Sequence, residues 1–493
     1  MGDAGQSDGL CAIFVHVGAG FHSLENSEQH LLSCKHAVRA GMVFLRNGGS
    51  AVDAVEIAIS ALEDDPITNS GYGSNLNEKG VVEGDATIVD HFGRSGAAGA
   101  VPHVKNPIML ARKIYDKASK NPGCGRIPPN FLAGKGAEDF AFENGLITMT
   151  NDEMVSPAAR SRWISWKEQI KAKESVARKE RPDDFLRQVQ DPMKVRISQS
   201  FQAPDMQTKV EGELETMRQN IDAAHDEMSI DRDALKYQPL HPLDFESFSE
   251  GSGLGDGQGF GDDGGDAITD TVGAIAVDRY GNIAAGSSSG GIGMKHRGRI
   301  GPAALIGIGT HVIPVDPEDP DETAVAAVTS GTGEHIASSF AASTSAARVY
   351  HCQKMNGNSH SEQVTEEEAL SAMITNEFIG HPAVRHSSLG GDIGIMAVKR
   401  TTDGIALYFA HNAKSFALGS MSSNDKLPSA VMSRVPDKGK GLGRHPVRIA
   451  QGGLMFRPVN RTPAPRTNPL QNEEQTPEPK RKERLHYFET LNF

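Results

Sequence analysis

The sequence predicts an α+β protein in which layered β-sheets are covered by helices. Strand-like and helix-like segments fall into separate runs instead of alternating regularly, which favours packed layers over a regular parallel α/β fold. The 493 residues are 38% hydrophobic, enough to bury a large core. No window approaches the roughly 18 consecutive apolar residues that a membrane span requires. We therefore expect a soluble, layered protein.

The first run of elements extends from about residue 11 to residue 147. It opens with the apolar stretch Ala12–Val17, which predicts a buried strand that stops at the glycines after it. Apolar residues at helical spacing predict helices around residues 34–45 and 51–62, and a Gly-rich turn follows at Asn69–Asn77. Further elements are expected in this order: strands at 81–89 and 96–101, then a helix at 107–117.

The second run extends from Asp270-Thr271 to about residue 436. Two apolar stretches, Thr271–Val277 and Ile283–Ser287, flank the turn sequence Asp278–Asn282, so they predict a hairpin whose first strand begins at Thr271. The remaining expected elements are a strand at 323–328, helices at 334–350 and 366–378, and a second hairpin formed by 392–398 and 405–410.

Two other segments have the composition of linkers. Residues 148–266 are rich in charged residues, Gln, Met and Pro, so we expect a flexible insert, in which Arg160–Glu180 could form a charged surface helix. Gly259–Gly264 matches GxGxxG, but no strand precedes it and no helix follows it, which argues against nucleotide binding. The tail from about 457 to 493 is expected to be disordered. Its basic cluster Lys480–Arg484 is either a nuclear import signal or a solvated tail.

Charge and cysteine content exclude several classes of protein. A formal net charge of −13 argues against direct binding of nucleic acid. Met1–Leu10 lacks the basic start and apolar centre of a secretory signal, so we expect the chain in the nucleus, the cytoplasm or both. The four cysteines are too far apart to indicate a zinc site or a disulfide framework, and we expect them to be buried thiols.

The junction Asp270-Thr271 has the features that an N-terminal nucleophile needs. A Thr hydroxyl is a poor nucleophile unless a base is adjacent. If the chain is cut before Thr271, the new α-amine, with an ordinary pKa of about 7.7 to 8.0, supplies that base on the same residue. The junction lies between a Gly-rich segment and a buried strand, so it can be cut and then held rigidly. Read locally, however, Thr271 could equally be an ordinary residue at the start of a strand.

Ordered motifs in both runs strengthen this interpretation. In the first run they are His16–Gly20, Glu63-Asp with Pro66, and Asn69–Asn75; in the second they are Thr271–Ala274, Gly281-Asn282, Ser288–Gly291, Gly298–Gly301 and Ser330–Glu334. In order and spacing they resemble the plant-type asparaginase family of N-terminal nucleophile hydrolases. The resemblance covers about residues 11–146 and 266–436, and leaves out the insert and the tail.

The resemblance implies a fold and a processed state. Members of this family form a four-layer αββα sandwich and are cut into two fragments, which here would be residues 1–270 and 271–493. Two processed protomers then pair into a dimer. Family members also keep a structural cation held by carbonyl oxygens, so sodium is a possible ligand of the Glu63–Asn69 loop. No metal or organic cofactor is required for the reaction that the family performs.

The resemblance also assigns roles to individual residues. Thr271 is the nucleophile, and Ser289 orients its amine. Ser330 and Gly331 match the donors that stabilise the oxyanion. Asn69 matches a residue that contacts the nucleophile, although an Asn in a Gly-rich turn could instead support the turn's backbone conformation. Arg299, Pro302 and Gly333 correspond to positions of the substrate pocket.

Pro302 separates two kinds of enzyme within the family. In asparaginases an Asp stands at this position and holds the free α-amine of the amino-acid substrate, whereas Pro302 offers neither charge nor side-chain acceptor. A free ammonium group would therefore lack its counter-ion there. An Asp inside a polypeptide has no free amine, and its side chain can pair with Arg299 through two parallel hydrogen bonds. In this respect the chain resembles the taspases, threonine aspartases that cleave after Asp.

Three functional hypotheses follow. The first is a self-processing threonine endopeptidase whose partners are proteins with an Asp cleavage site, expected to be nuclear regulators, without direct contact to nucleic acid or membranes. The second is an isoaspartyl peptidase or L-asparaginase that acts on small β-aspartyl substrates. The third is a scaffold that keeps the fold without activity.

Overall fold

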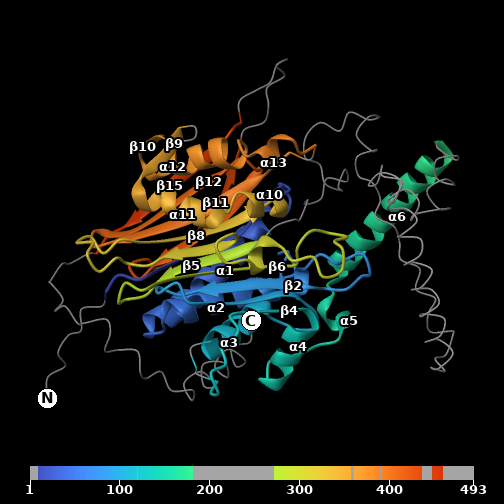
Figure 1. The fold of residues 1–493 in the computed structure, drawn as a ribbon, viewed down its shortest axis with the longest axis horizontal. Helices are drawn as coiled ribbons and strands as arrows, with labels where there is room; N and C mark the ends of the chain where they lie inside the picture. Colours follow the sequence, from blue (N-terminus) through green and yellow to red (C-terminus); the bar gives the residue numbers. More distant parts are fainter. Residues whose placement is uncertain are drawn as a thin grey trace, which may run out of the picture.

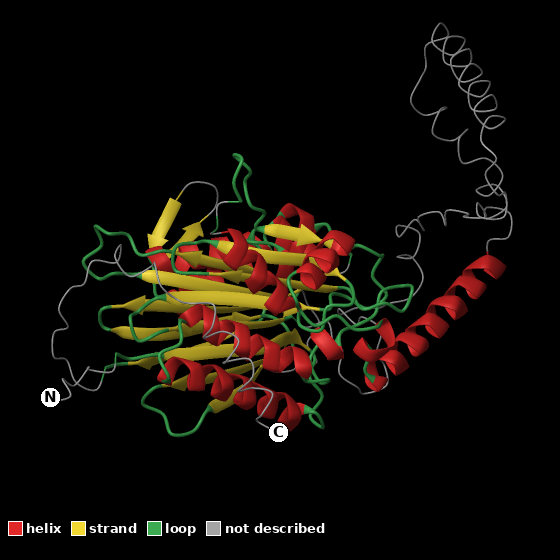
Figure 2. Ribbon diagram, turned by 90° about the horizontal axis from the view of Figure 1, so that it is seen from below, coloured by secondary structure: helices red, strands yellow, loops and turns green. Residues whose placement is uncertain are grey.

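The computed structural model describes residues 9–118, 120, 122–180, 271–356, 360–388, 390–435 and 447–458. Two β-sheets face each other, and helices cover the outer side of each (Figures 1 and 2). The α+β class and the four-layer αββα sandwich expected from the sequence are confirmed. Asp270, the GxGxxG match and the basic cluster in the tail lie outside the described residues.

The larger sheet has eight strands and joins the two runs of the sequence. Its order is β14-β13-β1-β5-β6-β2-β3-β4, with antiparallel neighbours except for the parallel pair β3 and β4. The bounds are β1 Ala12–Gly20, β2 Gly84–Val89, β3 Ser95–Val101, β4 Phe131–Ala133, β5 Val272–Val277, β6 Ile283–Ser289, β13 Ser415–Ser422 and β14 Ser429–Arg434. β5, which directly follows Thr271, therefore lies in the middle of the sheet.

The smaller sheet has five strands in the order β15-β12-β11-β8-β7, all antiparallel. The bounds are β7 Thr310–Ile313, β8 Ala324–Gly331, β11 Ile393–Thr401, β12 Gly404–His411 and β15 Ala450–Phe456. A separate pair, β9 Gln353–Asn356 and β10 His360–Gln363, lies beside the helices of this half.

Alternating side chains assign the two faces of the larger sheet. On β5, Val272 and Ala274 pack with the helices α1 (Ser27–Arg46) and α2 (Ala51–Asp64). Ile275 and Val277 point the other way, into the core between the sheets. Because successive residues of a strand face opposite sides, this alternation places the side chain of Thr271 on the side of the second sheet.

Helices cover the outer face of each sheet. The helix α3 (Pro107–Ala118) packs on β2 and β3, and α4 (Gly134–Glu143) extends the cover over β3 and β4. The helices α11 (Ala341–His351) and α12 (Glu366–Ala372) cover the smaller sheet, and α12 continues as a π-helical turn through Phe378. The short helix α13 spans Pro382–Arg385.

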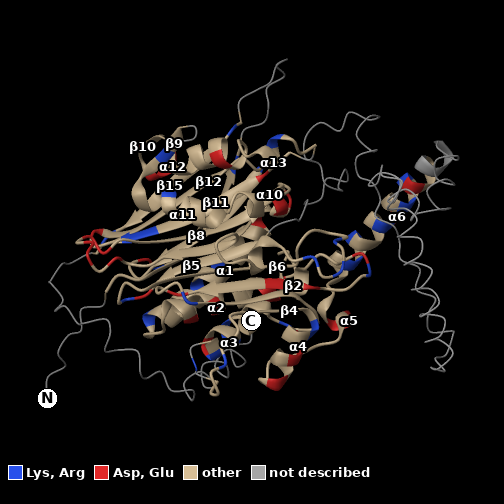
Figure 3. Ribbon diagram, viewed as in Figure 1, with Lys and Arg blue, Asp and Glu red and all other residues tan. Residues whose placement is uncertain are grey.

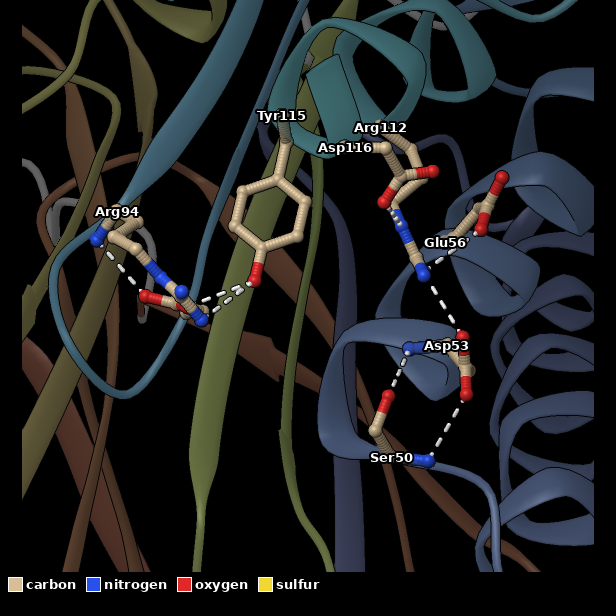
Figure 4. A network of polar contacts seen from close by, with 8 residues as sticks. Ser50, Asp53, Glu56, Arg94, Arg112, Tyr115 and Asp116 are labelled. Carbon is tan, nitrogen blue, oxygen red and sulfur yellow. Dashed lines mark hydrogen bonds and ion pairs between the residues drawn. The ribbon is translucent and has the colours of Figure 1, made fainter. Parts of the chain in front are cut away.

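A network of charged residues ties α2 to α3 (Figure 4). Arg112 on α3 contacts Asp53 at 3.0 Å, Glu56 at 3.1 Å and Asp116 at 2.8 Å. Asp53 also takes part in the capping box that starts α2 at Ser50. The network therefore fixes both where α2 begins and how α3 lies against it.

Several expected elements differ in extent. The predicted helix 334–350 is two helices, α10 (Gly333–Ser338) and α11, because Phe340 adopts a left-handed conformation with φ 49 and ψ 46 and breaks the run. The strand expected to stop at Gly18 continues to Gly20 as β1, past a register shift between His16 and Ala19. Gly18 has φ 108 at this irregularity, a conformation that favours glycine.

The beginning of the expected flexible insert is helical. The helix α5 spans Asn151–Met154 and α6 spans Pro157–Glu180, which extends the charged helix considered at Arg160–Glu180. Two tryptophans hold α6: Trp163 donates to the carbonyl of Asn77 at 2.9 Å, and a Cβ on Gly293 would lie 2.1 Å from the Trp166 ring. The apolar pattern is weak because only the first half of α6 packs, while its basic second half extends into solvent (Figures 2 and 3).

Other elements were not anticipated. The strands β13, β14 and β15 lie beyond the second predicted hairpin, and β13 pairs with β1 across more than 390 positions of sequence. Such long-range pairing leaves little local signal beyond alternation. None of the four cysteines forms a disulfide, but Cys124 is exposed and Cys352 half-buried, so the expectation of four buried thiols was wrong for these two.

Candidate active site

Thr271 lies at the entrance to β5, between the two sheets, and is 6% exposed. Its nitrogen donates to Ser330 Oγ at 3.3 Å. Ser330 is on β8 of the opposite sheet, and its side chain points into the space between the sheets, as Val328 two residues earlier also does. The predicted nucleophile and a predicted partner are thus brought together from strands in different sheets.

Ser330 Oγ accepts a second hydrogen bond, from the nitrogen of Ala19 at 3.0 Å. Ala19 follows the irregularity of β1 at Gly18, so the bulge turns this amide toward the site. A hydroxyl that accepts from two donors uses both lone pairs and keeps its own hydrogen to donate in a defined direction. In this arrangement the hydroxyl on the Thr271 nitrogen belongs to Ser330, whereas the resemblance assigned that role to Ser289.

Ser288 and Ser289 face opposite sides of the sheet. Val272 pairs with Ser288, so the antiparallel register places Thr271 opposite Ser289. The Ser289 side chain accepts from the nitrogen of Gly291 at 3.0 Å. Ser288 points to the helical side and donates to Glu63 Oε1 at 2.6 Å. Of this pair, therefore, Ser289 is the one on the side of the nucleophile.

His16 fills the space beside Thr271. It pairs with Gly273 in the register of β1 and β5, and a Cβ on Gly273 would lie 2.3 Å from His16 Nε2. Burial lowers the pKa of His16 to about 3, although the Thr271 backbone acts in the opposite direction. The imidazole is therefore neutral at physiological pH, and Gly273 is the residue that leaves room for it. Sequence reasoning included His16 in a motif but gave it no role.

Asn69 supports the loop that follows β6. Its Nδ2 donates to the carbonyl of Gly291 at 2.9 Å, and its Oδ1 accepts from the nitrogen of Asn75 at 2.8 Å. The nitrogen of Gly290 donates to the Asn69 carbonyl at 2.8 Å. Its side-chain hydrogen bonds thus go to backbone groups of the Gly-rich turn and the β6 loop, in agreement with the turn-supporting alternative.

The three predicted pocket residues Arg299, Pro302 and Gly333 are in contact. A Cβ on Gly333 would lie 2.5 Å from Arg299 Nη2 and 2.9 Å from Pro302 Cδ. Any larger residue at Gly333 would therefore displace the guanidinium or the proline ring. Gly331, two residues earlier, has φ 136, and a Cβ there would lie 2.2 Å from the carbonyl oxygen of Asp392. Gly331 thus allows the end of β8 to approach Asp392 closely, and Gly333 allows the start of α10 to approach the arginine loop.

Two acidic residues anchor the loop that carries Arg299, and sequence reasoning missed both. Asp85 on β2 is fully buried and accepts from the nitrogens of Ala100 and Gly301, each at 2.8 Å. Glu83 accepts from the nitrogen of Gly298 at 3.0 Å. Burial raises the pKa of Asp85, while the Lys295 charge acts in the opposite direction. Acidic residues in a segment otherwise typical of a buried strand were the available signal.

Lys295 completes this anchor. It is buried, and its Nζ donates to the carbonyl of Glu83 at 2.7 Å. Burial lowers the pKa of Lys295, and the charges of Asp85 and Glu83 act against that shift. A Cβ on Gly291, just after the end of β6, would lie 3.0 Å from Lys295 Nζ and 3.3 Å from Arg299 Nη1. The missing side chain of this glycine therefore leaves room for both cations.

The described part of the chain lacks two features, a cluster of metal-binding side chains and a membrane-spanning helix. Those residues contain no group of three or more His, Cys, Asp or Glu side chains arranged to hold a metal ion. None of the helices described there combines the length and the apolar character needed to cross a bilayer. The contacts described above bring together a threonine, neighbouring hydroxyls and an arginine.

Comparison with known proteins identifies the family of this chain. A family model described as asparaginase matches residues 10–403. The isoaspartyl peptidase/L-asparaginase of Xenopus laevis is 28% identical over 325 residues, which cover 66% of this chain and 71% of that protein. The enzymes of that name from Danio rerio and Homo sapiens are 38% identical over 157 residues and 41% over 152, covering 31% and 30% of this chain and 47% and 46% of theirs. The chain belongs to the asparaginase family of N-terminal nucleophile hydrolases.

Proposed function

We propose that this protein is a self-processing threonine endopeptidase that cleaves polypeptides after Asp. The observation that carries the proposal is the close packing of Arg299, Pro302 and Gly333. A guanidinium there can pair with a side-chain carboxylate, while the residue that packs beside it is an apolar proline. This combination suits an Asp within a chain, which brings a carboxylate and no α-ammonium group.

The precursor would act on itself first. The hydroxyl of Thr271 attacks the carbonyl carbon of Asp270, and the peptide C–N bond breaks as the acyl group moves from nitrogen to oxygen. Water then hydrolyses the resulting ester and leaves the α-amine of Thr271 free. Asp270 is the residue type that the arginine pocket would select, so its own side chain can dock there during this step.

Turnover would use the same groups. The freed α-amine accepts the proton of the Thr271 hydroxyl, and the hydroxyl oxygen attacks the carbonyl carbon of a substrate Asp. Ser330 Oγ, which lies 3.3 Å from the Thr271 nitrogen, is placed to orient that amine. Backbone donors near Gly331 are our candidates for stabilising the oxyanion. Proton transfer to the leaving amine gives an acyl-enzyme, which water clears.

A second candidate is supported by the relatives. The proteins from Xenopus laevis, Danio rerio and Homo sapiens carry the name isoaspartyl peptidase/L-asparaginase, which favours activity on small β-aspartyl substrates. That reaction needs an acceptor for the substrate's α-ammonium group. Among the described residues the acid paired with this guanidinium is Glu334, which contacts Arg299 at 2.8 Å and would have to accept the ammonium group that Pro302 cannot.

The two candidates share the processing step and differ in substrate. Intact mass should show fragments that end at Asp270 and begin at Thr271, and Thr271→Ala should remain a single chain. The processed enzyme is then offered a peptide with an internal Asp-Gly bond, a β-aspartyl dipeptide and free asparagine. We expect turnover of the peptide only. Turnover restricted to the two small substrates would reject the endopeptidase in favour of the second candidate.

Some expectations from the sequence also remain proposals. We expect a dimer of processed protomers, protein substrates among nuclear regulators, and location in the nucleus or cytoplasm. The proposed cation would use backbone carbonyls of the Glu63–Asn69 loop, which turn toward the glycines that follow. A Cβ on Gly71 would lie 2.3 Å from the backbone carbonyl oxygen of Glu63, and a Cβ on Gly73 would lie 2.0 Å from that of Thr68. Carbonyl oxygens suit a hard cation such as sodium, and bound sodium would stiffen this loop.

A further inference from the structure

The guanidinium of Arg299 has two edges that can bind a carboxylate, and the chain itself occupies one of them. Glu334 Oε1 accepts from Arg299 Nε at 3.0 Å and from Nη2 at 2.8 Å. This contact uses the side edge of the guanidinium. An arginine has five N–H donors in a rigid fork, and within the described part of the chain no group accepts from the edge formed by Nη1 and the second hydrogen of Nη2.

Glycines border the edge that remains. A Cβ on Gly291 would lie 3.3 Å from Nη1, and a Cβ on Gly333 would lie 2.5 Å from Nη2. Gly291 follows Ser289 at the end of β6, and Gly333 follows Gly331 at the end of β8. The two strand ends that flank Thr271 therefore also flank this edge of the guanidinium, and neither places a side chain in front of it.

The Glu334 side chain is much more exposed than the arginine with which it pairs. The Arg299 side chain is 15% exposed, whereas the Glu334 side chain is 61% exposed. Glu334 lies in the first turn of α10, directly after Gly333. Its carboxylate thus reaches the arginine from the solvent side, whereas most of the Arg299 side chain is buried.

We infer that Glu334 is a positioning residue: it fixes the rotation of the Arg299 guanidinium so that the Nη1–Nη2 edge faces the carboxylate of the substrate Asp. The inference rests on the proposed function, in which Arg299 receives that carboxylate. Arg299 would then bridge two carboxylates, one from its own chain and one from the substrate. The opposite arrangement, in which Glu334 blocks the arginine until substrate displaces it, predicts the reverse sign for the effect of its removal.

The experiment compares Glu334→Gln and Glu334→Asp with a matched control, Glu322→Gln. Glu322 pairs with Arg400 at 2.9 Å with side-chain exposures of 52% and 17%, close to the values for Glu334 and Arg299, but it lies at the opposite end of β8. kcat and KM for an Asp-Gly peptide are measured per processed molecule. Inhibition by succinate, a dicarboxylate that needs only the arginine, provides a reading independent of turnover.

For Glu334→Gln we expect KM and the succinate inhibition constant to rise together by about three- to tenfold, with kcat changed by less than about twofold. Glu334→Asp should recover part of the loss, and Glu322→Gln should match the unaltered enzyme. A fall in both constants would overturn the inference in favour of the blocking arrangement, and unchanged constants would overturn it outright. Unaltered kinetics in Arg299→Ala would instead reject the proposed pocket itself, so the two failures are distinguishable.

Discussion

Two arginines of this protein illustrate different uses of the same side chain. Arg112, in the network of Figure 4, is surrounded by Asp53, Glu56 and Asp116, and its side chain is mostly buried. Arg299 has one carboxylate partner, Glu334, which is largely exposed, and glycines border its remaining edge. The neighbouring carboxylates raise the pKa of Arg112 despite its burial.

The difference shows how a structural cation can be told from one that is available to a ligand. Arg112 donates from Nε and Nη1 to three acids that its own chain supplies. Arg299 keeps an edge beside the nucleophile, and the missing Cβ atoms of Gly291 and Gly333 leave that edge uncovered. The number of partners and the residues that border the guanidinium decide the role, because both side chains are equally charged.

The largest effect on stability is expected for Arg112→Ala. Removing the guanidinium leaves three mostly buried carboxylates close together without a cation. Breaking a buried ion pair in this way typically lowers the free energy of unfolding by about 3–5 kcal/mol. Denaturant unfolding measures this loss, with Arg299→Ala as the control. Molecules of the variant that remain folded and processed should keep the KM of the unaltered enzyme. Equal stability of the two variants would remove the distinction drawn between the arginines.

Arg299→Ala should show the reverse pattern. Stability should stay within about 1 kcal/mol, because its pair with Glu334 is partly exposed. Transition-state binding should weaken by about 2–5 kcal/mol, since the substrate carboxylate loses a partner that forms two hydrogen bonds. The measurement is kcat/KM on an Asp-Gly peptide beside the unfolding midpoint. A large loss of stability with intact kinetics would make Arg299 a second structural arginine.

Glu63 provides a third case, a buried carboxylate that has hydrogen-bond donors but no contacting cation among the described residues. Burial raises its pKa to about 8 from an ordinary value of 4.5, against the opposing effect of the Ser288 hydroxyl. The folded state therefore binds this proton more tightly than the unfolded state. Its contribution to stability is fully present below pH 4.5 and is lost as the pH rises through about 8.

Glu63→Gln should remove that dependence, because the amide does not ionise. The free energy of unfolding is measured between pH 5 and pH 9. Over this range we expect it to fall less for the variant than for the unaltered protein, with a difference between the two falls of about 1–3 kcal/mol. Asp64→Asn is the matched control, since Asp64 is half exposed and paired with Lys105. Parallel pH profiles for Glu63→Gln and the unaltered protein would contradict the shift.

The sequence predicted much of the fold because many elements are specified locally. The helices α1, α2 and α3 follow from apolar residues at helical spacing, and the β5–β6 hairpin follows from two apolar runs and a turn. The α6 helix was harder to place, because its packing depends on Trp163 and Trp166 meeting glycines that are far away in sequence. The break at Phe340 has no local signal that periodicity alone could show.

By itself, the sequence determined the candidate nucleophile Thr271, the arginine loop and its proline, because these are short motifs whose chemistry depends on residue type and spacing. Only the tertiary structure decided that the hydroxyl on the Thr271 nitrogen belongs to Ser330, 59 positions away, and that Glu334 occupies one edge of Arg299 from 35 positions away. The contact of Thr271 with Ser330 depends on the register and facing of strands in two sheets, and a shift of one residue would turn either side chain to the opposite face. The contact of Glu334 with Arg299 depends on how α10 packs against the arginine loop.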